Sequence, residues 1–506
     1  MPSLDEGCDD GRGFLVSATA GRGGEFDPTL HNEDLAPISA ERRNWSWVNY
    51  STVWMGMVHN VVAYTTAAGL ISLGMSPWQA IGTVAVANLV LILAMWANSI
   101  AGAKYGLPFP VLLRASFGRN GAQIPVFIRA FVAIFWFAVQ TYVGSLAVGA
   151  ILGSLIPGWS SLDFSILGMG LNGWISFAIF WALHAYVILH GMERIKFFEL
   201  WAGPIVIVMG LILVVWAMNV AGGIAPLFDQ PSQLSPGEFW PLFALSVTGL
   251  VSVWSTLVLN IPDFTRFSRS QRDQMVGQAI GLPLTTILFS IMSIAITAGS
   301  VLAFGEAISD PVALVQEFGN PIVLILGVAT ILIATLSVNV AANIVSPAYD
   351  LVNMFPRRLN FVRAGLISIV IGVFFAPWLW MHDAGTIFAV LGYIGGALGP
   401  VAGIMLVDFY LIRRRNYDLD SFYTKTGDYE YSGGWNPRAL IATALGLIVA
   451  FVGVYAPLLG LDALGFLAAY TWFLGLAASA LAYAVLMPKE SPELAEPALE
   501  IAEELR

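Results

Sequence analysis

Charge, cysteine and histidine are all scarce in this 506-residue chain, and each scarcity excludes a class of protein. Charged residues make up 11% of the chain, against about 25% in soluble domains. The single cysteine, Cys8, cannot form an internal disulfide framework. Five scattered histidines, with no pair at metal-ligand spacing, argue against a metal enzyme and a tightly bound metal. No catalytic dyad is visible, so we expect neither an enzyme nor a cofactor.

Apolar residues are abundant, at 57% of the chain with a mean hydropathy of +0.75. We therefore predict an all-α polytopic membrane protein in contact with lipid, without a nucleic-acid or obligate protein partner. Residues 1–45 are predicted to be a polar, mobile cytoplasmic tail rather than a signal peptide, and residues 488–506 an acidic cytoplasmic tail. Runs of about 20 residues predict about twelve transmembrane helices near 48–73, 78–102, 122–156, 173–192, 195–221, 239–262, 278–304, 320–352, 361–379, 383–412, 437–458 and 463–487.

Basic residues predict the orientation of these spans, because Lys and Arg accumulate in cytoplasmic loops. With both termini in the cytoplasm, every loop predicted to lie outside lacks Lys and Arg. The basic residues then fall in cytoplasmic loops, at Lys104, Arg114, Arg119, Arg194, Lys196, Arg266, Arg269, Arg272, Arg357, Arg358, Arg363, Arg413, Arg414, Arg415, Lys425 and Arg438. We expect a multi-pass protein of the plasma membrane.

Two spans carry polar or glycine residues at mid-depth, where a helix is expected to break. The first has Gly56, His59 and Asn60, and the sixth has Thr248 and Gly249. These spans begin two blocks of five, which predicts two inverted repeats, 46–221 and 239–412, with residues 437–487 outside them. Close helix packing is an alternative explanation for the glycines.

Trp136 and Gln140 lie in the middle of the third span and share one helix face. An indole offers a flat surface for stacking, and an amide offers an acceptor and two donors. For the pair alone, packing by Trp136 and an interhelical hydrogen bond from Gln140 are the favoured explanation.

Further polar side chains occupy the middle of other spans, and side chains of this kind face the bundle interior or a cavity. The set consists of Asn60, Trp254, Ser337, Asn339 and Asn343. Together with Trp136 and Gln140 they predict one binding site. The site contains no charged residue, so we expect a small, neutral, flat heterocycle with amide-like edges.

Several motifs resemble those of the nucleobase–cation symporter-1 family over about residues 36–488. Their sequences are similar to those of the bacterial allantoin permease branch. They are Trp54–Asn60 (WMGMVHN), Leu107–Ser116 (LPFPVLLRAS), Phe135–Gln140 (FWFAVQ), Asn260–Arg266 (NIPDFTR), Asn339–Tyr349 (NVAANIVSPAY) and Gly399–Gly403 (GPVAG). The resemblance implies a leucine-transporter-like fold of two inverted five-helix repeats with broken helices 1 and 6, plus two peripheral helices. It also implies that Trp136 and Trp254 sandwich the substrate, while Gln140, Asn343 and Asn60 contact its edges, with Asn339 in the same group.

The resemblance also implies a cation site between the first and eighth spans, at Gly56, His59, Ala334, Ser337 and Val338. Sodium-dependent relatives carry a hydroxyl where this chain has Val338. A valine methyl group cannot coordinate Na⁺, so the coupling ion is expected to be H⁺ rather than Na⁺. A histidine side chain can titrate near neutrality, but for His59 a neutral, hydrogen-bonded imidazole is favoured over a proton carrier.

The sequence thus predicts a secondary transporter that imports a neutral ureide or nucleobase-like ring, with allantoin favoured, by cation symport and alternating access. Uracil, cytosine or hydantoin as substrate is the nearest alternative. A facilitator or channel is another, because it also tolerates a polar lining.

Overall fold

The structure, a computed structural model, describes residues 27–162, 164–308, 310–381 and 384–488. Its α-helices are α1 (Trp47–Val58), α2 (Val61–Ser72), α3 (Pro77–Tyr105), α4 (Phe109–Phe117), α5 (Gln123–Leu155), α6 (Leu171–Leu189), α7 (Gly191–Ala221), α8 (Ala225–Phe228), α9 (Pro236–Asn260), α10 (Pro262–Thr265), α11 (Gln271–Ala279), α12 (Thr285–Phe304), α13 (Pro311–Glu317), α14 (Pro321–Asn343), α15 (Val345–Met354), α16 (Phe361–Val373), α17 (Ala384–Val407), α18 (Pro437–Tyr455) and α19 (Thr471–Leu486). Two short strands, β1 (Ser165–Ile166) and β2 (Met169–Gly170), pair antiparallel in the loop before α6.

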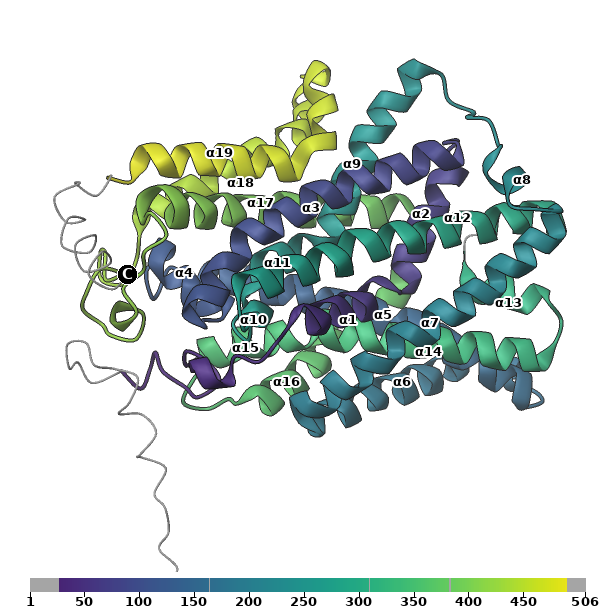
Figure 1. The fold of residues 1–506 in the computed structure, drawn as a ribbon, viewed down its shortest axis with the longest axis horizontal. Helices are drawn as coiled ribbons and strands as arrows, with labels where there is room; N and C mark the ends of the chain where they lie inside the picture. Colours follow the sequence, from purple (N-terminus) through teal and green to yellow (C-terminus); the bar gives the residue numbers. More distant parts are fainter. Residues whose placement is uncertain (1–26, 163, 309, 382–383, 489–506) are drawn as a thin grey trace, which may run out of the picture.

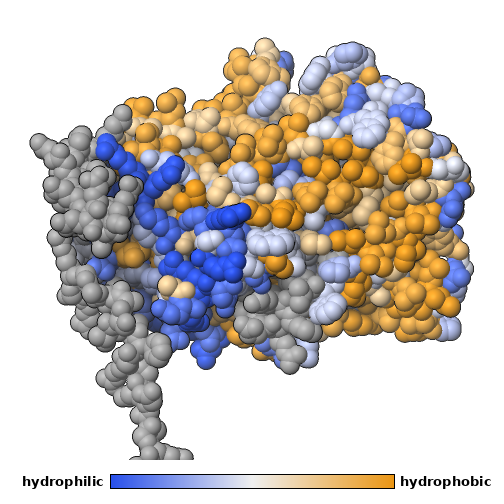
Figure 2. All heavy atoms as spheres, viewed as in Figure 1, coloured by the Kyte–Doolittle hydropathy of each residue, from blue (hydrophilic) through white to orange (hydrophobic). Residues whose placement is uncertain are grey.

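The predicted all-α polytopic architecture is confirmed. Eleven helical segments of the described chain are long and apolar enough to cross a membrane. The pair α1 and α2 adds 24 residues in two halves, which at 1.5 Å per residue is also enough to cross. Most long helices run along one axis, with α17, α18 and α19 together on one side (Figure 1). Apolar residues cover the flank, and hydrophilic residues gather at the end that holds α10 and α15 (Figure 2).

The expected break in the first span is present, and Asn60 satisfies the backbone groups that it exposes. The Asn60 Oδ1 atom accepts from the Ala63 amide at 3.1 Å, which caps the start of α2. The Asn60 Nδ2 atom donates to the carbonyls of Met57 at 2.8 Å and Val58 at 3.2 Å, at the end of α1. One side chain therefore stabilises both helix ends, which lipid could not do.

The expected break in the sixth span is wrong, because α9 is a continuous helix through Thr248 and Gly249. The Thr248 hydroxyl donates to the carbonyl of Ala469 on the neighbouring segment, and the Thr248 carbonyl accepts from the Ser252 hydroxyl. Polar groups at this depth are thus satisfied without interrupting the helix. No proline lies between Pro241 and the end of α9 to force an interruption.

A second interruption lies in the eighth span, where Ile344 separates α14 from α15. Pro347 explains it, since a proline lacks the N–H that would bond the carbonyl of Asn343 four residues earlier. The interruption comes directly after Asn343. We did not predict this interruption, although Pro347 was a readable signal for it.

Residues 27–45 are packed against the helices, which corrects the prediction that residues 1–45 form a mobile tail. Leu35 is fully buried, and the backbone carbonyls of Asp34 and Ala36 accept from the buried guanidinium of Arg266 at 2.9 and 2.6 Å. Apolar residues spaced along this segment provide the burial that a polar tail lacks. Residues 1–26 and 489–506 lie outside the described residues.

Buried charges lie near the hydrophilic end, and Asp263 and Asp350 are each paired or hydrogen-bonded there. Asp350 forms an ion pair with Arg129 at 3.3 Å, and both side chains are fully buried. Asp263 accepts from the Phe109 amide at 2.8 Å. Burial raises the pKa of Asp263 above its ordinary value, against the opposite effect of nearby Arg129. Arg129, absent from the predicted polar set, joins α5 to α15.

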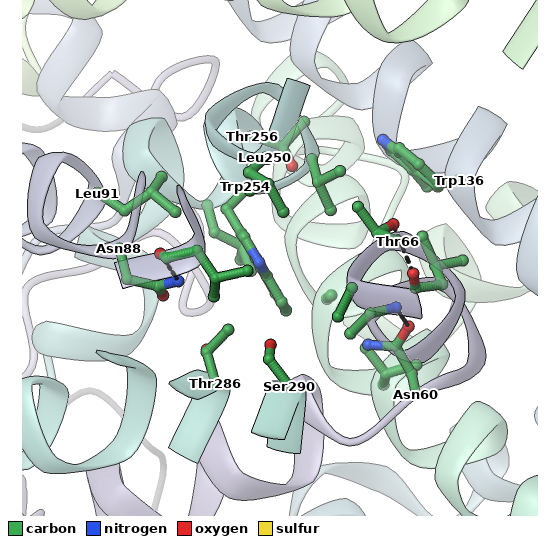
Figure 3. A pocket seen from close by; sticks show the side chains of 18 of the residues that line it. Asn60, Thr66, Asn88, Leu91, Trp136, Leu250, Trp254, Thr256, Thr286 and Ser290 are labelled. Carbon is green, nitrogen blue, oxygen red and sulfur yellow. Dashed lines mark hydrogen bonds between the residues drawn. The ribbon is translucent and has the colours of Figure 1, made fainter. Parts of the chain in front are cut away.

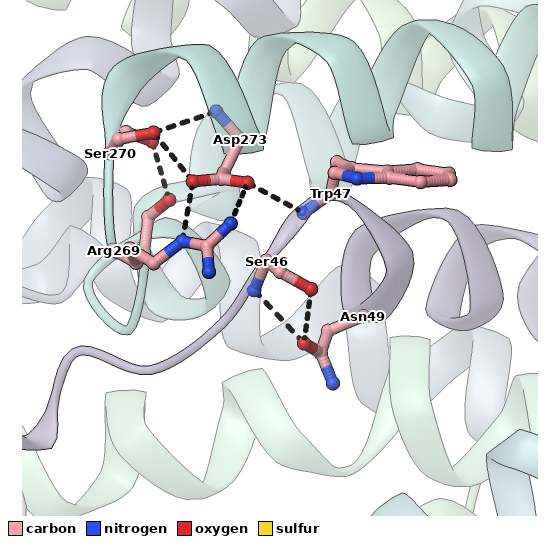
Figure 4. Close-up of polar contacts among 7 residues, drawn as sticks. Ser46, Trp47, Asn49, Arg269, Ser270 and Asp273 are labelled. Carbon is pink, nitrogen blue, oxygen red and sulfur yellow. Dashed lines mark hydrogen bonds and ion pairs between the residues drawn. The ribbon is translucent and has the colours of Figure 1, made fainter.

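The start of α1 is tied to the start of α11 by a small polar cluster (Figure 4). Asp273 accepts from the Trp47 amide at 3.1 Å, and the Ser270 hydroxyl accepts from the Asp273 amide at 3.0 Å. Arg269 donates twice to the Asp273 carboxylate, at 2.9 and 3.0 Å. These bonds satisfy amides at the first turn of each helix.

We expect Asp273→Ala to lower the apparent melting temperature of the detergent-solubilised protein clearly more than Arg269→Gln. Losing Asp273 removes the acceptor of a partly buried helix-start amide, a loss of about 0.5–2 kcal/mol. Arg269 is 60% exposed, so its ion pair contributes at most about 1 kcal/mol. Equal shifts for the two variants, measured by fluorescence-detected thermal unfolding, would contradict this ranking.

Candidate functional site

A cavity inside the bundle contains five of the six residues predicted to bind substrate. They come from four spans and lie around one space, at Asn60, Trp136, Gln140, Trp254 and Asn343. Figure 3 shows the indoles of Trp136 and Trp254 and the amide of Asn60 at this cavity. None of the residues lining the cavity, all within the described chain, is Asp, Glu, Lys or Arg. The cavity is therefore suited to an uncharged ligand.

Trp136 and Gln140 lie one turn apart on α5, as their spacing predicted, and both are buried. The Nε1–H of Trp136 and the Oε1 of Gln140 have no hydrogen-bond partner among the described residues. A buried polar group without a partner costs about 1–3 kcal/mol. One unpaired donor and one unpaired acceptor therefore lie at the same cavity, where a ligand with both kinds of group would pair them.

Trp254 comes from α9 and faces the cavity from another side. Its ring packs edge-to-face against Trp54 of α1, with centroids 5.7 Å apart. The ring of Trp136 packs edge-to-face against Phe135, with centroids 6.1 Å apart. Neighbouring aromatic rings thus fix the orientation of both indoles, which leaves their faces as candidate stacking surfaces.

Asn339 does not line the cavity but supports Asn343, which does. The Asn339 Oδ1 atom accepts from the Asn343 Nδ2 atom at 2.9 Å. The Asn339 Nδ2 atom lies within hydrogen-bond distance of Phe137 O, Thr141 Oγ1 and His184 Nε2, at 3.2, 3.1 and 3.0 Å. His184 can accept, because its Nδ1 atom donates to the Phe180 carbonyl. Asn339 thus connects α14 with α5 and α6, and its contacts are those of a positioning residue.

The cavity also contains polar residues that the sequence analysis missed. Asn88 of α3 and Thr286 and Ser290 of α12 all line it, as does Thr66 of α2 (Figure 3). Asn88 lies in the second span, and Thr286 and Ser290 lie in the seventh. Asn88 was a readable signal, since it is an amide in the middle of an apolar span. Thr286 and Ser290 carried little signal, because hydroxyls commonly bond their own helix.

The predicted cation site falls where α1 packs against α14. Ala334 and Val338 share a core cluster with Val58, one residue before His59. Ser337 is fully buried, and it is the only side-chain hydroxyl among the five predicted residues. Gly56 and His59 are also buried. These five residues are therefore buried in or next to two helices that pack together, and Val338 presents only methyl groups.

A second cavity of about 270 Å³ lies on the other side of that break. Its walls come mainly from apolar residues of α7, α12 and α14, and two of the predicted cation-site residues, His59 and Ala334, also line it. The His59 ring packs edge-to-face against Phe289 at 4.7 Å, and its Nδ1 atom donates to the Met55 carbonyl. Asn60 lines both cavities.

We expect Asn339→Leu to destabilise the protein more than Asn343→Leu. The first change removes the donor shared by three buried acceptors and also the support of Asn343, at about 1–3 kcal/mol for each group left unpaired. The second change removes one bond at the edge of a cavity. The apparent melting temperatures of the two variants measure the difference, and an unchanged value for Asn339→Leu would contradict the positioning role.

Comparison with known proteins agrees with this geometry. The family described as "Permease for cytosine/purines, uracil, thiamine, allantoin" matches residues 37–475. The allantoin permease of Bacillus subtilis (strain 168) is 47% identical over 467 residues, which cover 92% of this chain and 94% of that protein.

Solved structures give the same result. Mhp1, a nucleobase-cation-symport-1 family transporter solved in a closed conformation with bromovinylhydantoin bound, superposes with a TM-score of 0.76. It is 26% identical, and the match covers 90% of this chain and 95% of that one. The inward-facing conformation of Mhp1 gives a TM-score of 0.71 over 90% of this chain and 93% of that one, at 26% identity. A bound closed state and an inward-facing state of one protein are what alternating access requires. This chain belongs to the nucleobase–cation symporter-1 family, and it is a multi-pass membrane permease of the cation-symport type rather than an enzyme.

Proposed function

We propose that this permease imports allantoin, a neutral ureide, from outside the cell. The observation that carries the proposal is the uncharged cavity with two tryptophans and unpaired amide and indole groups. The ring of allantoin is a flat cyclic urea with two carbonyls and two N–H groups. A carbonyl of the ring would accept from the side-chain N–H of Gln140, and a ring N–H would donate to Gln140 Oε1. That oxygen has no hydrogen-bond partner among the described residues.

The indoles of Trp136 and Trp254 would stack on the two faces of the ring. Stacking on an aromatic side chain contributes about 1–3 kcal/mol per face in nucleic-acid bases, which are similar planar amides. Asn343 and Asn60 would contact the ring edges, and Asn339 would act by holding Asn343. The relative that is 47% identical is an allantoin permease, which supports this choice of substrate within a family that also includes cytosine and uracil permeases.

The orientation of the protein in the membrane is proposed from its basic residues. Loops that carry Lys104, Arg119 and Lys425 meet at one end of the bundle, where Arg119 donates to the Lys425 carbonyl. We propose that this end faces the cytoplasm of a plasma-membrane protein, with both termini on the same side. We also propose that residues 46–221 and 239–412 are the two inverted repeats, and that residues 437–487 are peripheral.

We expect saturable allantoin uptake by purified protein in proteoliposomes, with counterflow when unlabelled allantoin is preloaded. Trp136→Ala and Trp254→Ala should each raise the apparent Kd by about one to two decades, because each loses one stacking face. Competition by hydantoin, uracil and cytosine ranks the alternative substrates. Strong uracil uptake without allantoin uptake would replace the proposed substrate, and uptake without counterflow would indicate a channel. Tryptophan variants that fold and bind like the parent would disprove the sandwich.

For the coupling ion, we propose H⁺ rather than Na⁺. A site for Na⁺ must replace the hydration shell of the ion with oxygen ligands. In the predicted set, only Ser337 offers a side-chain hydroxyl, and Val338 is buried and apolar. Backbone carbonyls near the break of the first span would have to supply the remaining ligands. His59, which lies at that break, is the candidate proton carrier.

We expect parent uptake to follow an imposed pH gradient and to respond weakly to sodium. Val338→Thr should increase the sodium dependence, because it restores an oxygen ligand beside Ser337. Val338→Ile is the matched control, since it changes the volume without adding oxygen. Uptake that requires millimolar sodium and ignores a protonophore would refute proton coupling. An unchanged pH profile in His59→Gln would exclude His59 as the carrier.

A further inference from the structure

Asn88 is buried in the wall of the substrate cavity with an unused acceptor. Its side chain is 2% exposed and its Nδ2 atom donates to the Val84 carbonyl at 2.9 Å. That bond fixes the amide orientation, because a carbonyl can only accept. The Oδ1 atom of Asn88 is the free end of this amide, and it is buried without a partner among the described residues.

The other polar groups near Asn88 also favour a donor from the ligand. Thr286 lines the same cavity, and its hydroxyl hydrogen is donated to the Leu282 carbonyl at 2.6 Å. Only the oxygen lone pairs of Thr286 are then free for a ligand. Two acceptors without a neighbouring acid attract a neutral N–H group rather than an ammonium group, which would need a carboxylate to offset its desolvation.

In the view of Figure 3, Asn88 lies on one side of the Trp254 indole, and Trp136 and Asn60 lie on the other. All four residues line one cavity. A ring stacked between the two tryptophans would therefore leave the space beside Asn88 unfilled. A substituent on the ring could reach around the edge of the Trp254 indole into that space.

The geometry points to a second subsite, formed by Asn88 and Thr286, that binds the N–H groups of an acyclic ureido arm. This inference rests on the proposed function, because it assumes that a flat ring occupies the space between Trp136 and Trp254. The arm of allantoin ends in an N–H and an NH₂ group, which match the two acceptors. Hydantoin, the same ring without the arm, leaves the subsite empty. Asn88 is thus a specificity residue that separates ureides from simple cyclic imides.

The experiment compares the Kd values of allantoin and hydantoin for the parent and three variants, by tryptophan-fluorescence titration of the purified full-length protein. Asn88→Leu should weaken allantoin binding about tenfold while changing hydantoin binding less than about twofold. Valine has nearly the same shape as threonine, so Thr286→Val should weaken allantoin binding by a smaller factor and leave hydantoin binding unchanged. Unchanged hydantoin binding also shows that each variant is folded.

Thr66→Val is the matched control. Thr66 lines the same cavity from α2, and its hydroxyl likewise donates to its own helix, at Val62 O. The same substitution there should leave the ratio of the two Kd values unchanged. Equal losses for both ligands, or no loss, in Asn88→Leu and Thr286→Val would overturn the subsite while leaving the proposed function intact. A parent protein that binds hydantoin but not allantoin would overturn both.

Discussion

A membrane helix can be interrupted only where other groups bond the backbone atoms that the interruption exposes. In this protein the amide of Asn60 meets that requirement, since it caps α2 with its oxygen and bonds the end of α1 with its nitrogen. The break lies at Asn60, which lines both cavities, and at His59, which is one of the predicted cation-site residues. The substrate and the ion would therefore meet at one interrupted helix, which provides a physical route for coupling between them.

The eighth span is also interrupted, and there a proline causes the interruption. Pro347 leaves the carbonyl of Asn343 without its helical donor, and the helix is interrupted at Ile344. Because α14 packs against α1, the two interruptions lie in neighbouring helices, and each is next to an asparagine of the cavity. The sixth span is not interrupted at Thr248. Its hydroxyl donates to the Ala469 carbonyl, and its carbonyl accepts from the Ser252 hydroxyl.

Much of this arrangement was predictable from sequence because it depends on local patterns. Apolar run length located the spans, and the four-residue spacing put Trp136 and Gln140 on one face of α5. The break predicted in α9 is wrong because Thr248 and Gly249 were treated as helix breakers. The Thr248 hydroxyl instead bonds the carbonyl of Ala469 on a neighbouring segment, and α9 stays continuous. Asn339 and Asn343 have the same spacing, yet only Asn343 lines the cavity, because His184 and Thr141 hold Asn339 elsewhere. Such tertiary partners cannot be read from spacing.

The hydrogen-bonding state of the cavity also bears on which substrate fits. Both N–H groups of Asn60 are committed to carbonyls, so toward a ligand it can only accept, through the second lone pair of Oδ1. Gln140 Oε1 and Asn88 Oδ1 are acceptors as well, and neither has a partner within the described part of the chain. A ligand that pairs all three must supply at least that many N–H groups around a flat ring. Uracil and hydantoin have two N–H groups each. A ring with a ureido arm has more, so it could pair all three acceptors, which uracil and hydantoin could not.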